Sequence, residues 1–273
     1  MATGRYSSLM TPADMIDRSR YALDDGALIA SCRTQFESEG VCVLPGFLTA
    51  DAVSTMVDEA RRLESLAFRS HSSSTPYLAQ PEAEFPDGHP RRTLVHSQVE
   101  VVAYDQFPSD SALRRLYEWD PLLDFVRRCL GLEVMHRYAD PFGALNLSVM
   151  RDGDALCWHF DMADFVVSLA LQSSDRGGDF DNAKQLRTVD DPNYDAVAAV
   201  LADRAPNLVR TEPMTPGTLM LFNGRWSMHR VTTIEGSTPR YVALLAYDTE
   251  PGTNSTHALK MSRYGRLPVG AES

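Results

Sequence analysis

The second half of the chain is a succession of short apolar or alternating stretches separated by Gly, Pro and Asp. Each stretch has the length and the β-branched or aromatic content of a strand, and the residues between them favour turns. They occupy residues 132–140, 144–151, 157–172, 177–183, 207–213, 217–223, 228–236 and 240–248. Only residues 193–205 interrupt them with a helical pattern. Many short strands at this spacing predict an antiparallel sandwich or barrel, because a parallel sheet would need crossover helices.

The segment before residue 131 has a more helical pattern. Residues 49–67 carry apolar side chains at helical spacing, and Thr49 is placed to cap the N-terminus of this helix. Residues 109–119 and 121–131 predict two further helices, the second of which begins at a proline and stops at a glycine. We therefore expect helices first and a β-core after them.

The first half also contains a short predicted strand and a long segment without a periodic pattern. Residues 40–47 predict a short strand closed by a Pro-Gly turn. Residues 67–92 are rich in Ser, Pro, Gly and charge and show no period. A connection of that length inside a compact domain is usually functional or disordered, so it is either a lid over a pocket or a disordered segment.

The pattern indicates a single domain over residues 1–273. Within it, residues 1–130 are expected to form a mostly helical support and the lid, and residues 131–250 the β-core with the functional site. Residues 251–273 are expected to form a C-terminal tail.

The stretch CWHFDMADF, residues 157–165, places a histidine and a carboxylate two positions apart. On a strand, residues i and i+2 point to the same face, so His159 and Asp161 would lie side by side. A third ligand is available at His229, on another predicted strand 229 − 159 = 70 residues downstream. Two imidazoles and one carboxylate form the facial arrangement of non-heme Fe(II) oxygenases, with coordination positions left open. A core histidine beside a solvated aspartate is the alternative.

A basic side chain follows this set. Arg240 stands near the start of the next predicted strand. A guanidinium binds a carboxylate through two parallel hydrogen bonds, so Arg240 could hold the far end of a metal-chelating dicarboxylate such as 2-oxoglutarate. Each of these residues alone is a weak signal. Their order on strands of one β-rich core makes the combined signal stronger than any of its parts.

Four segments together resemble a known family: residues 144–172, 177–181, 216–232 and 239–252. They are similar to the Fe(II)/2-oxoglutarate-dependent oxygenases, and among these to the bacterial subgroup that hydroxylates or halogenates free amino acids. The resemblance covers residues 131–250 and is faint before them. It implies a mainly β fold with N-terminal helices around a double-stranded β-helix core of the jelly-roll, cupin-like type.

The resemblance also implies roles for individual residues. His159, Asp161 and His229 would be the iron ligands, with Fe(II), 2-oxoglutarate and dioxygen as cofactor and cosubstrates. Arg240 would anchor the C5 carboxylate of 2-oxoglutarate, and Asn146 matches in placement a polar side chain that often contacts this cosubstrate. The protein would orient the reactants and exclude water, because the oxidising chemistry belongs to the metal and cosubstrate.

One ligand position bears on the type of reaction. In the radical halogenases of this subgroup, Gly or Ala stands where this chain has Asp161, and chloride takes the vacated site. The carboxylate therefore favours hydroxylation of an unactivated C–H over chlorination. Oxidative desaturation or cyclisation at the same site is the alternative outcome.

The expected substrate is a free amino acid or a derivative of one. Three residues near the ligands are candidates for contacting it: Asp164, Trp226 and Asn223. Structural roles explain them equally well: Asp164 could accept a structural hydrogen bond, Trp226 could be a core residue and Asn223 could belong to a turn. His136 has no partner for metal binding in the sequence and is expected to be a core or supporting residue.

Charge and composition exclude several partners. The formal net charge is −11 at pH 7, and no basic stripe overrides it, so neither nucleic acid nor an anionic membrane is expected to bind. The four cysteines have no C-x-x-C spacing, which favours buried free thiols over disulfides or a thiolate zinc site. With no apolar leader and no long apolar run, the sequence predicts a cytoplasmic location.

Three other functions remain open. The first is a cupin-type metal enzyme that does not use 2-oxoglutarate. Arg240 discriminates between the two, because only an enzyme that uses 2-oxoglutarate should require it. The second is a non-enzymatic β-sandwich binding protein in which the H-x-D motif is incidental, and metal binding would separate the two. The third, zinc-dependent hydrolysis, is disfavoured because no Glu or His base is evident beside the three ligands.

Overall fold

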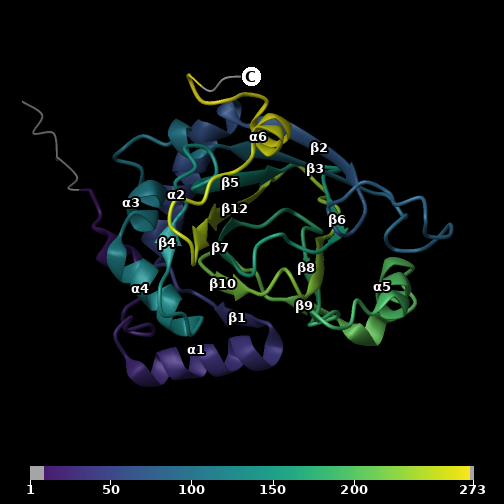
Figure 1. Cartoon of the computed structure of the whole chain (residues 1–273). Coiled ribbons are helices and arrows are strands. Elements are labelled where there is room, and N and C mark those ends of the chain that lie inside the picture. The colour runs from purple at the N-terminus through teal and green to yellow at the C-terminus, as the bar shows by residue number, and fades with distance from the viewer. Residues whose placement is uncertain (1–8, 271–273) are drawn as a thin grey trace, which may run out of the picture.

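Two antiparallel sheets face each other and form the centre of the protein (Figure 1). The computed structural model describes residues 9–270. The larger sheet has seven strands in the order β1-β10-β7-β12-β5-β3-β2, and the smaller has four in the order β6-β11-β8-β9. A separate pair, β13 and β4, lies beside them. The predicted mainly β fold with a double-stranded β-helix core is confirmed.

The strands are β1 Val41–Leu44, β2 Phe68–Ser74, β3 Val95–Val102, β4 His136–Arg137, β5 Leu145–Met150, β6 Leu156–His159, β7 Val166–Gln172, β8 Phe180–Ala183, β9 Val209–Glu212, β10 Leu219–Phe222, β11 Met228–Val231, β12 Arg240–Leu245 and β13 Tyr247–Asp248. The helices are α1 Gly26–Glu39, α2 Ala50–Leu63, α3 Ala112–Tyr117, α4 Asp120–Cys129, α5 Tyr194–Leu201 and α6 His257–Tyr264. Short 3-10 turns are Pro12–Met15, Glu64–Leu66, Tyr104–Gln106 and Pro206–Leu208.

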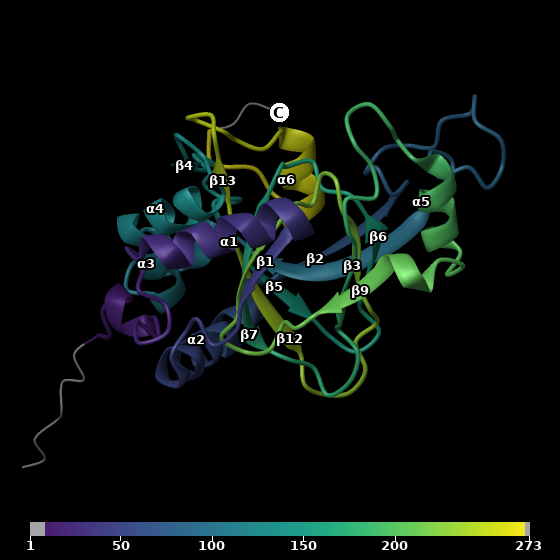
Figure 2. The ribbon, with the colours of Figure 1, turned by 90° about the horizontal axis from the view of Figure 1, so that it is seen from below.

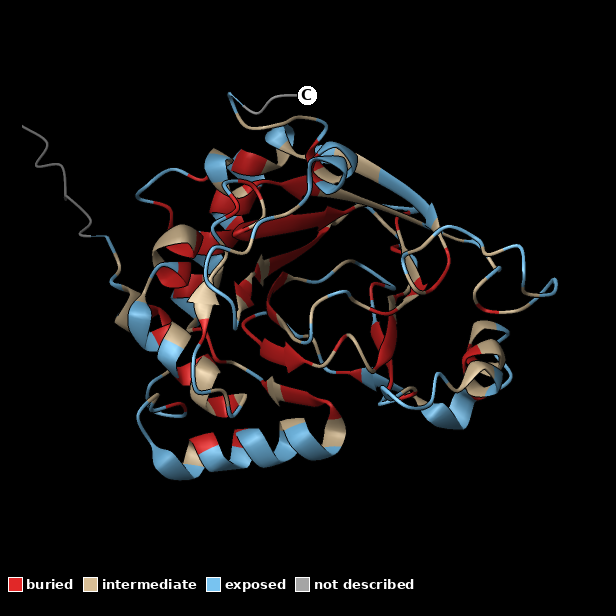
Figure 3. Ribbon diagram, in the orientation of Figure 1, coloured by how far each residue is buried: buried red, intermediate tan, exposed pale blue. Residues whose placement is uncertain are grey.

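Helices α1 to α4 cover the outer face of the larger sheet (Figure 2). In α2, the side chains of Ala52, Met56 and Ala60 recur at helical spacing and are fully buried. Thr49 caps this helix by accepting a hydrogen bond from the backbone N–H of Ala52, as predicted. The opposite side of the helices remains exposed, which is plain for α1 (Figure 3). The core of the protein therefore lies between the helices and the sheet.

A second, smaller interior separates the two sheets. Met150 and Phe222 of the larger sheet pack there against Phe180 and Val231 of the smaller one. Because side chains alternate along a strand, the residues that share this inner face also include the buried polar residues Asn146, Ser148, Ser168, Asn182 and His229. Polar groups in a buried space need partners, so their presence marks this interior as the place for a functional site.

The first half of the chain contributes more to the sheets than its sequence predicts. Strands β1, β2 and β3 all join the larger sheet, and β2 occupies part of the segment 67–92 that was expected to be irregular. The reason is that β2 is an edge strand with mostly exposed Ser-rich residues, so it lacks the apolar alternation that marks a strand. Residues 75–94 contain no helix or strand.

The C-terminal segment is more structured than the expected tail. It contains α6, which packs on β2 and β3. Lys260 of this helix is buried and donates hydrogen bonds to Asn254 and to the carbonyl of Ser255. Its apolar residues Leu259 and Met261 are exposed and the charged Lys260 is buried, so the apolar pattern does not mark the buried face of this helix.

The four cysteines are free, and three of them, Cys32, Cys42 and Cys129, are buried, in agreement with the expectation. Cys157 is half-buried. Among residues 9–270, no helix is both long enough and apolar enough to cross a membrane.

Candidate metal centre

Three side chains meet at the edge of the smaller sheet: His159, Asp161 and His229. The Nε2 atom of His159 lies 3.7 Å from Asp161 Oδ1, and the Nε2 atom of His229 lies 3.4 Å from Asp161 Oδ2. The two imidazole centroids are 4.2 Å apart. One ligand atom from each residue lies within 4.8 Å of the others, which is close enough to share one metal ion.

The two histidines meet because of the register of the smaller sheet. His159 ends β6 and is the direct cross-strand partner of His229 in β11. Directly opposite residues in an antiparallel pair project to the same face, so both rings enter the space between the sheets. His229 is buried there, and the side chain of His159 is 16% exposed. Strand pairing therefore explains why His159 and His229, which are 70 positions apart in the sequence, lie side by side as predicted.

Each imidazole is oriented by a carbonyl two residues before it. His159 Nδ1 lies 2.7 Å from the carbonyl oxygen of Cys157, and His229 Nδ1 lies 3.1 Å from that of Ser227. A proton on each Nδ1 is required for these hydrogen bonds, which leaves the lone pair of each Nε2 directed at the shared space. Burial lowers the pKa of His229 to about 4, against the opposing effect of Asp161. A neutral imidazole of this kind is the form that binds metals.

Asp161 lies just beyond the strand on which the sequence placed it. Strand β6 ends at His159, and residues 160–165 form a loop before β7. The backbone N–H of Asp161 donates to the carbonyl oxygen of Gly224, 2.9 Å away, in the turn before β11. This bond holds the carboxylate beside the histidines even though the strand has ended. The side chain is 22% exposed, so the site opens to the surface at Asp161.

Arg240 begins β12 and is buried, only 7% exposed. No carboxylate lies within ion-pair distance of its guanidinium in residues 9–270. Burial lowers its pKa to about 10, an effect that the charge of Asp179 opposes. It shares the inner face with Met150, its cross-strand partner. A buried cation without an anion is costly unless a ligand provides one, so this side chain is suited to bind a carboxylate between the sheets.

Asn146 also lies on the inner face and is buried. Its amide nitrogen donates to the carbonyl oxygens of Phe142 and Leu145, and its Oδ1 accepts a hydrogen bond from the hydroxyl of Tyr264. Both donors are thus used within the protein. The hydroxyl of Ser168, on the same inner face, is buried and has no hydrogen-bond partner in the described residues.

The three substrate candidates lie on loops at the edge of the site. Asp164, in the loop after β6, is 71% exposed at its side chain and forms an ion pair with Arg225. Asn223 and Trp226 belong to the turn between β10 and β11, next to the ligand His229. The Oδ1 atom of Asn223 is buried without a partner in the described residues. His136, by contrast, lies in the separate β4–β13 pair and is not part of the metal set.

No motif or spacing in the sequence pointed to Arg187, which lies close to the ligand loop. Its guanidinium carbon is 4.0 Å from the ring centroid of Phe160, the residue between the two ligands of the H-x-D motif. Tyr77 and Trp226 lie further out, at 5.3 and 5.8 Å. Its Nε donates to the carbonyl oxygen of Arg225. The only local signal is a polar run, which is typical of any loop, so its position depends on tertiary packing.

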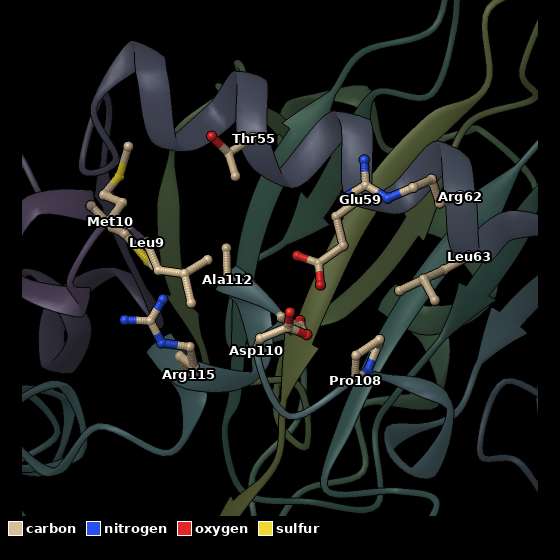
Figure 4. Close-up of a pocket in the computed structure, with 12 residues that line it drawn as sticks. Leu9, Met10, Thr55, Glu59, Arg62, Leu63, Pro108, Asp110, Ala112 and Arg115 are labelled. Atoms are coloured by element: carbon tan, nitrogen blue, oxygen red, sulfur yellow. The ribbon is translucent and has the colours of Figure 1, made fainter. Parts of the chain in front are cut away.

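A cavity of about 440 Å³ lies away from these residues, between α2, α3 and the N-terminal segment (Figure 4). The carboxylate of Glu59 points into it from α2 (Figure 4). It accepts a hydrogen bond from the backbone N–H of Leu113, 3.3 Å away, in the first turn of α3. A structural role at the start of α3 explains this buried acid, so we do not assign the active site to this cavity.

Comparison with known proteins supports the fold and the family. The family model described as Halogenase D matches residues 24–263. No curated protein matches the sequence.

Solved structures of related fold cover most of the chain at low identity. The epimerase SnoN from nogalamycin biosynthesis, in complex with Fe3+, α-ketoglutarate and nogalamycin RO, has a TM-score of 0.57 and 17% identity, covering 91% of this chain and 93% of its own. A prolyl hydroxylase from Trichoplax adhaerens has a TM-score of 0.54 and 15% identity, covering 83% and 91%. An oxidoreductase of the 2OG-Fe(II) oxygenase family from Burkholderia pseudomallei has a TM-score of 0.53 and 14% identity, covering 85% and 94%.

Proposed function

The chain belongs to the halogenase D family, and from this premise we propose that it is an Fe(II)- and 2-oxoglutarate-dependent oxygenase that hydroxylates a small substrate. The observation that carries the proposal is the convergence of His159, Asp161 and His229. The fold that the chain shares with 2-oxoglutarate oxygenases supports it.

The donor set fits ferrous iron. Two imidazoles and one carboxylate, all from one side, match the facial site of non-heme Fe(II) oxygenases. The rings of Phe180 and Phe222 lie 5.5 and 4.7 Å from that of His229 and keep water from this side of the site. When bound, Fe(II) and 2-oxoglutarate would use dioxygen to hydroxylate a substrate C–H bond, with release of succinate and CO2. The contribution of the chain is to hold the ligands, orient the reactants and exclude water.

Arg240 supports the use of 2-oxoglutarate. Its guanidinium is buried, lies on the inner face between the sheets and has no acidic partner in the described residues. A distal carboxylate of the cosubstrate would supply the missing anion and could form two hydrogen bonds with the planar guanidinium. A cupin-type enzyme that does not use 2-oxoglutarate would leave this buried charge unexplained.

Asp161 supports hydroxylation within a family named for halogenation. A halide ligand needs a vacant position on the metal, and in radical halogenases a small residue provides it. Here the carboxylate stands 3.4 Å from His229 Nε2 and would fill the third protein position. We therefore assign hydroxylation, with desaturation or cyclisation as the alternative outcomes of the same site.

We further propose an amino acid substrate whose carboxylate binds Arg187. This guanidinium stacks on Phe160, and no carboxylate is within ion-pair distance of it in residues 9–270. Two neighbouring arginines, Arg91 and Arg225, are paired with Glu82 and Asp164, whereas Arg187 is not. Desolvation lowers its pKa, and the charges of Arg225 and Arg91 act in the same direction. An anion bound there would relieve this repulsion.

Asp164, Trp226 and Asn223 stay candidates for further substrate contacts.

The test is anaerobic reconstitution with Fe(II) and 2-oxoglutarate, followed by exposure to air with each of a panel of free amino acids. We expect succinate formation and a product heavier by one oxygen atom for at least one of them. The Arg240→Gln variant, as the matched control, should lose both. Succinate formation without any product across the panel would contradict the substrate class, and turnover independent of 2-oxoglutarate would contradict the whole proposal.

A further inference from the structure

We propose that Gly224 determines whether position 161 can carry a metal-binding carboxylate, because the two residues compete for one space. The inference rests on the proposed metal site for its functional meaning. Its steric part can be tested separately.

The contact between these residues leaves no room for a side chain at position 224. A Cβ atom there would lie 1.8 Å from Oδ2, 2.6 Å from Cγ and 2.8 Å from Cβ of Asp161. Non-bonded carbon atoms normally stay about 3.5–4.0 Å apart. Since the clash includes the Cβ atom of Asp161, a small adjustment at the end of the carboxylate would not relieve it.

The backbone of Asp161 is held against the same glycine. Its N–H donates to the carbonyl oxygen of Gly224, and the N–H of the preceding residue, Phe160, donates to the carbonyl oxygen of Pro76. The ring of Phe160 is fully buried and stacks on Tyr77. The loop therefore cannot retreat without breaking these contacts. Rotation of the Asp161 side chain would remove the clashes with Oδ2 and Cγ but not the one with Cβ, so a side chain at 224 must also shift the backbone at this contact. Both movements take the carboxylate oxygens away from the two Nε2 atoms.

The requirement for glycine is steric and not conformational. Gly177, Gly178 and Gly236 have positive φ angles, which L side chains rarely adopt, whereas Gly224 does not. An alanine would accept the backbone conformation of residue 224. The three nearest atoms that its Cβ would meet all belong to the side chain of Asp161.

The pairing therefore links the two positions. A carboxylate at 161 requires glycine at 224, and glycine at 161, which has no Cβ, removes these three clashes and permits alanine at 224. Position 224 would thus act as a positioning residue that decides whether the metal receives a third protein ligand or keeps a vacant position. Under the proposed function, that choice is the one between hydroxylation and halogenation.

The experiment measures Co(II) binding to the metal-free full-length protein by calorimetric titration and by the visible spectrum of the bound ion. We expect Gly224→Ala to weaken binding by about 10- to 100-fold, as loss of correct ligand orientation does elsewhere. Asp161→Gly should weaken it to a similar extent. The double variant Asp161→Gly/Gly224→Ala should bind Co(II) as Asp161→Gly does, because the second change then removes nothing. Gly26→Ala is the matched control, since a Cβ there meets no atom within 4 Å.

Thermal unfolding of the same metal-free variants tests the steric part alone. Gly224→Ala should lower the melting temperature when Asp161 is present and leave it unchanged in the Asp161→Gly background. If Gly224→Ala fails to fold, the double variant should restore folding. Wild-type Co(II) affinity in Gly224→Ala, or equal effects of Gly224→Ala in both backgrounds, would overturn the inference. Equal Co(II) affinity of the wild type and Asp161→Gly would instead overturn the proposed metal site, while the unfolding data would still decide the steric relation.

Discussion

His159 and His229 are direct cross-strand partners in β6 and β11, and their ring centroids lie 4.2 Å apart. A shift of the strands by one residue would turn one ring to the outer face, where Trp158 and Arg230 now lie against each other. The pairing of β6 with β11 therefore creates the two-imidazole part of the site. The third ligand comes from a loop that hydrogen-bonds to the turn before β11.

This arrangement predicts the effect of removing the carboxylate. In Asp161→Gly the two imidazoles remain, because neither depends on Asp161 for its Nδ1 hydrogen bond. We expect hydroxylation to fall at least ~100-fold in the absence of chloride, since the iron would lose one of the three protein ligands that we propose. Product analysis with and without chloride checks this. Full hydroxylation by this variant would show that Asp161 is no ligand.

Arg240 should behave differently with and without the cosubstrate. Replacing it by Met removes a buried cation that forms no ion pair in the described residues, so metal-free Arg240→Met should gain stability, by about 1–3 kcal/mol. The KM for 2-oxoglutarate should rise by about 30-fold or more, because a buried charge pair can no longer form.

Melting temperatures with and without 2-oxoglutarate separate these two effects. The cosubstrate should raise the melting temperature of the wild type and leave that of the variant unchanged. A variant that is less stable without the cosubstrate would indicate that Arg240 has a structural partner instead.

Glu59 gives a pH prediction that is independent of the site. Burial raises its pKa above the ordinary value of 4.5, although hydrogen bonds from Ser111 and Leu113 oppose this. The folded protein therefore binds this proton more tightly than the unfolded chain. The resulting stability is present below about pH 4.5 and is lost as the pH rises through the higher folded pKa.

The matched variant is Glu59→Gln, which cannot ionise. Its free energy of unfolding minus that of the wild type should increase as the pH rises from 4.5 to 7, and urea unfolding across this range measures the difference. Glu37→Gln, an exposed change on α1, should show no such trend. A difference that is constant with pH would mean that Glu59 keeps its ordinary pKa in the folded protein.

The sequence predicted what depends on local pattern. The apolar runs around β5, β7, β10 and β12 are buried strands, and the H-x-D motif at the end of β6 lies opposite His229. It missed β2, whose Ser-rich residues are mostly exposed at a sheet edge. It also missed Gly224 and Arg187, because their roles depend on one contact each with the 160–165 loop that no spacing reveals. The periodicity of apolar residues predicts which positions are buried, but it does not predict individual tertiary contacts such as those of Gly224 and Arg187.

Arg187 provides the test of the substrate class. If its guanidinium binds the substrate carboxylate, Arg187→Gln should raise the KM for the amino acid by about 10- to 100-fold, corresponding to a charge-assisted hydrogen bond of about 1.5–3 kcal/mol. The KM for 2-oxoglutarate should not change, because Arg240 is the residue that we assign to it. Initial rates at varied concentrations of each compound distinguish the two.

A matched control is Arg176→Gln, since Arg176 is exposed and already pairs with Glu235. It should leave both KM values unchanged. The amide analogue of the amino acid, which lacks the carboxylate charge, should bind the wild type and Arg187→Gln equally weakly, because the lost interaction is the same in both cases. If Arg187→Gln weakens binding of the amide analogue as much as binding of the amino acid, Arg187 maintains the conformation of the loop through Phe160 and does not bind the substrate carboxylate.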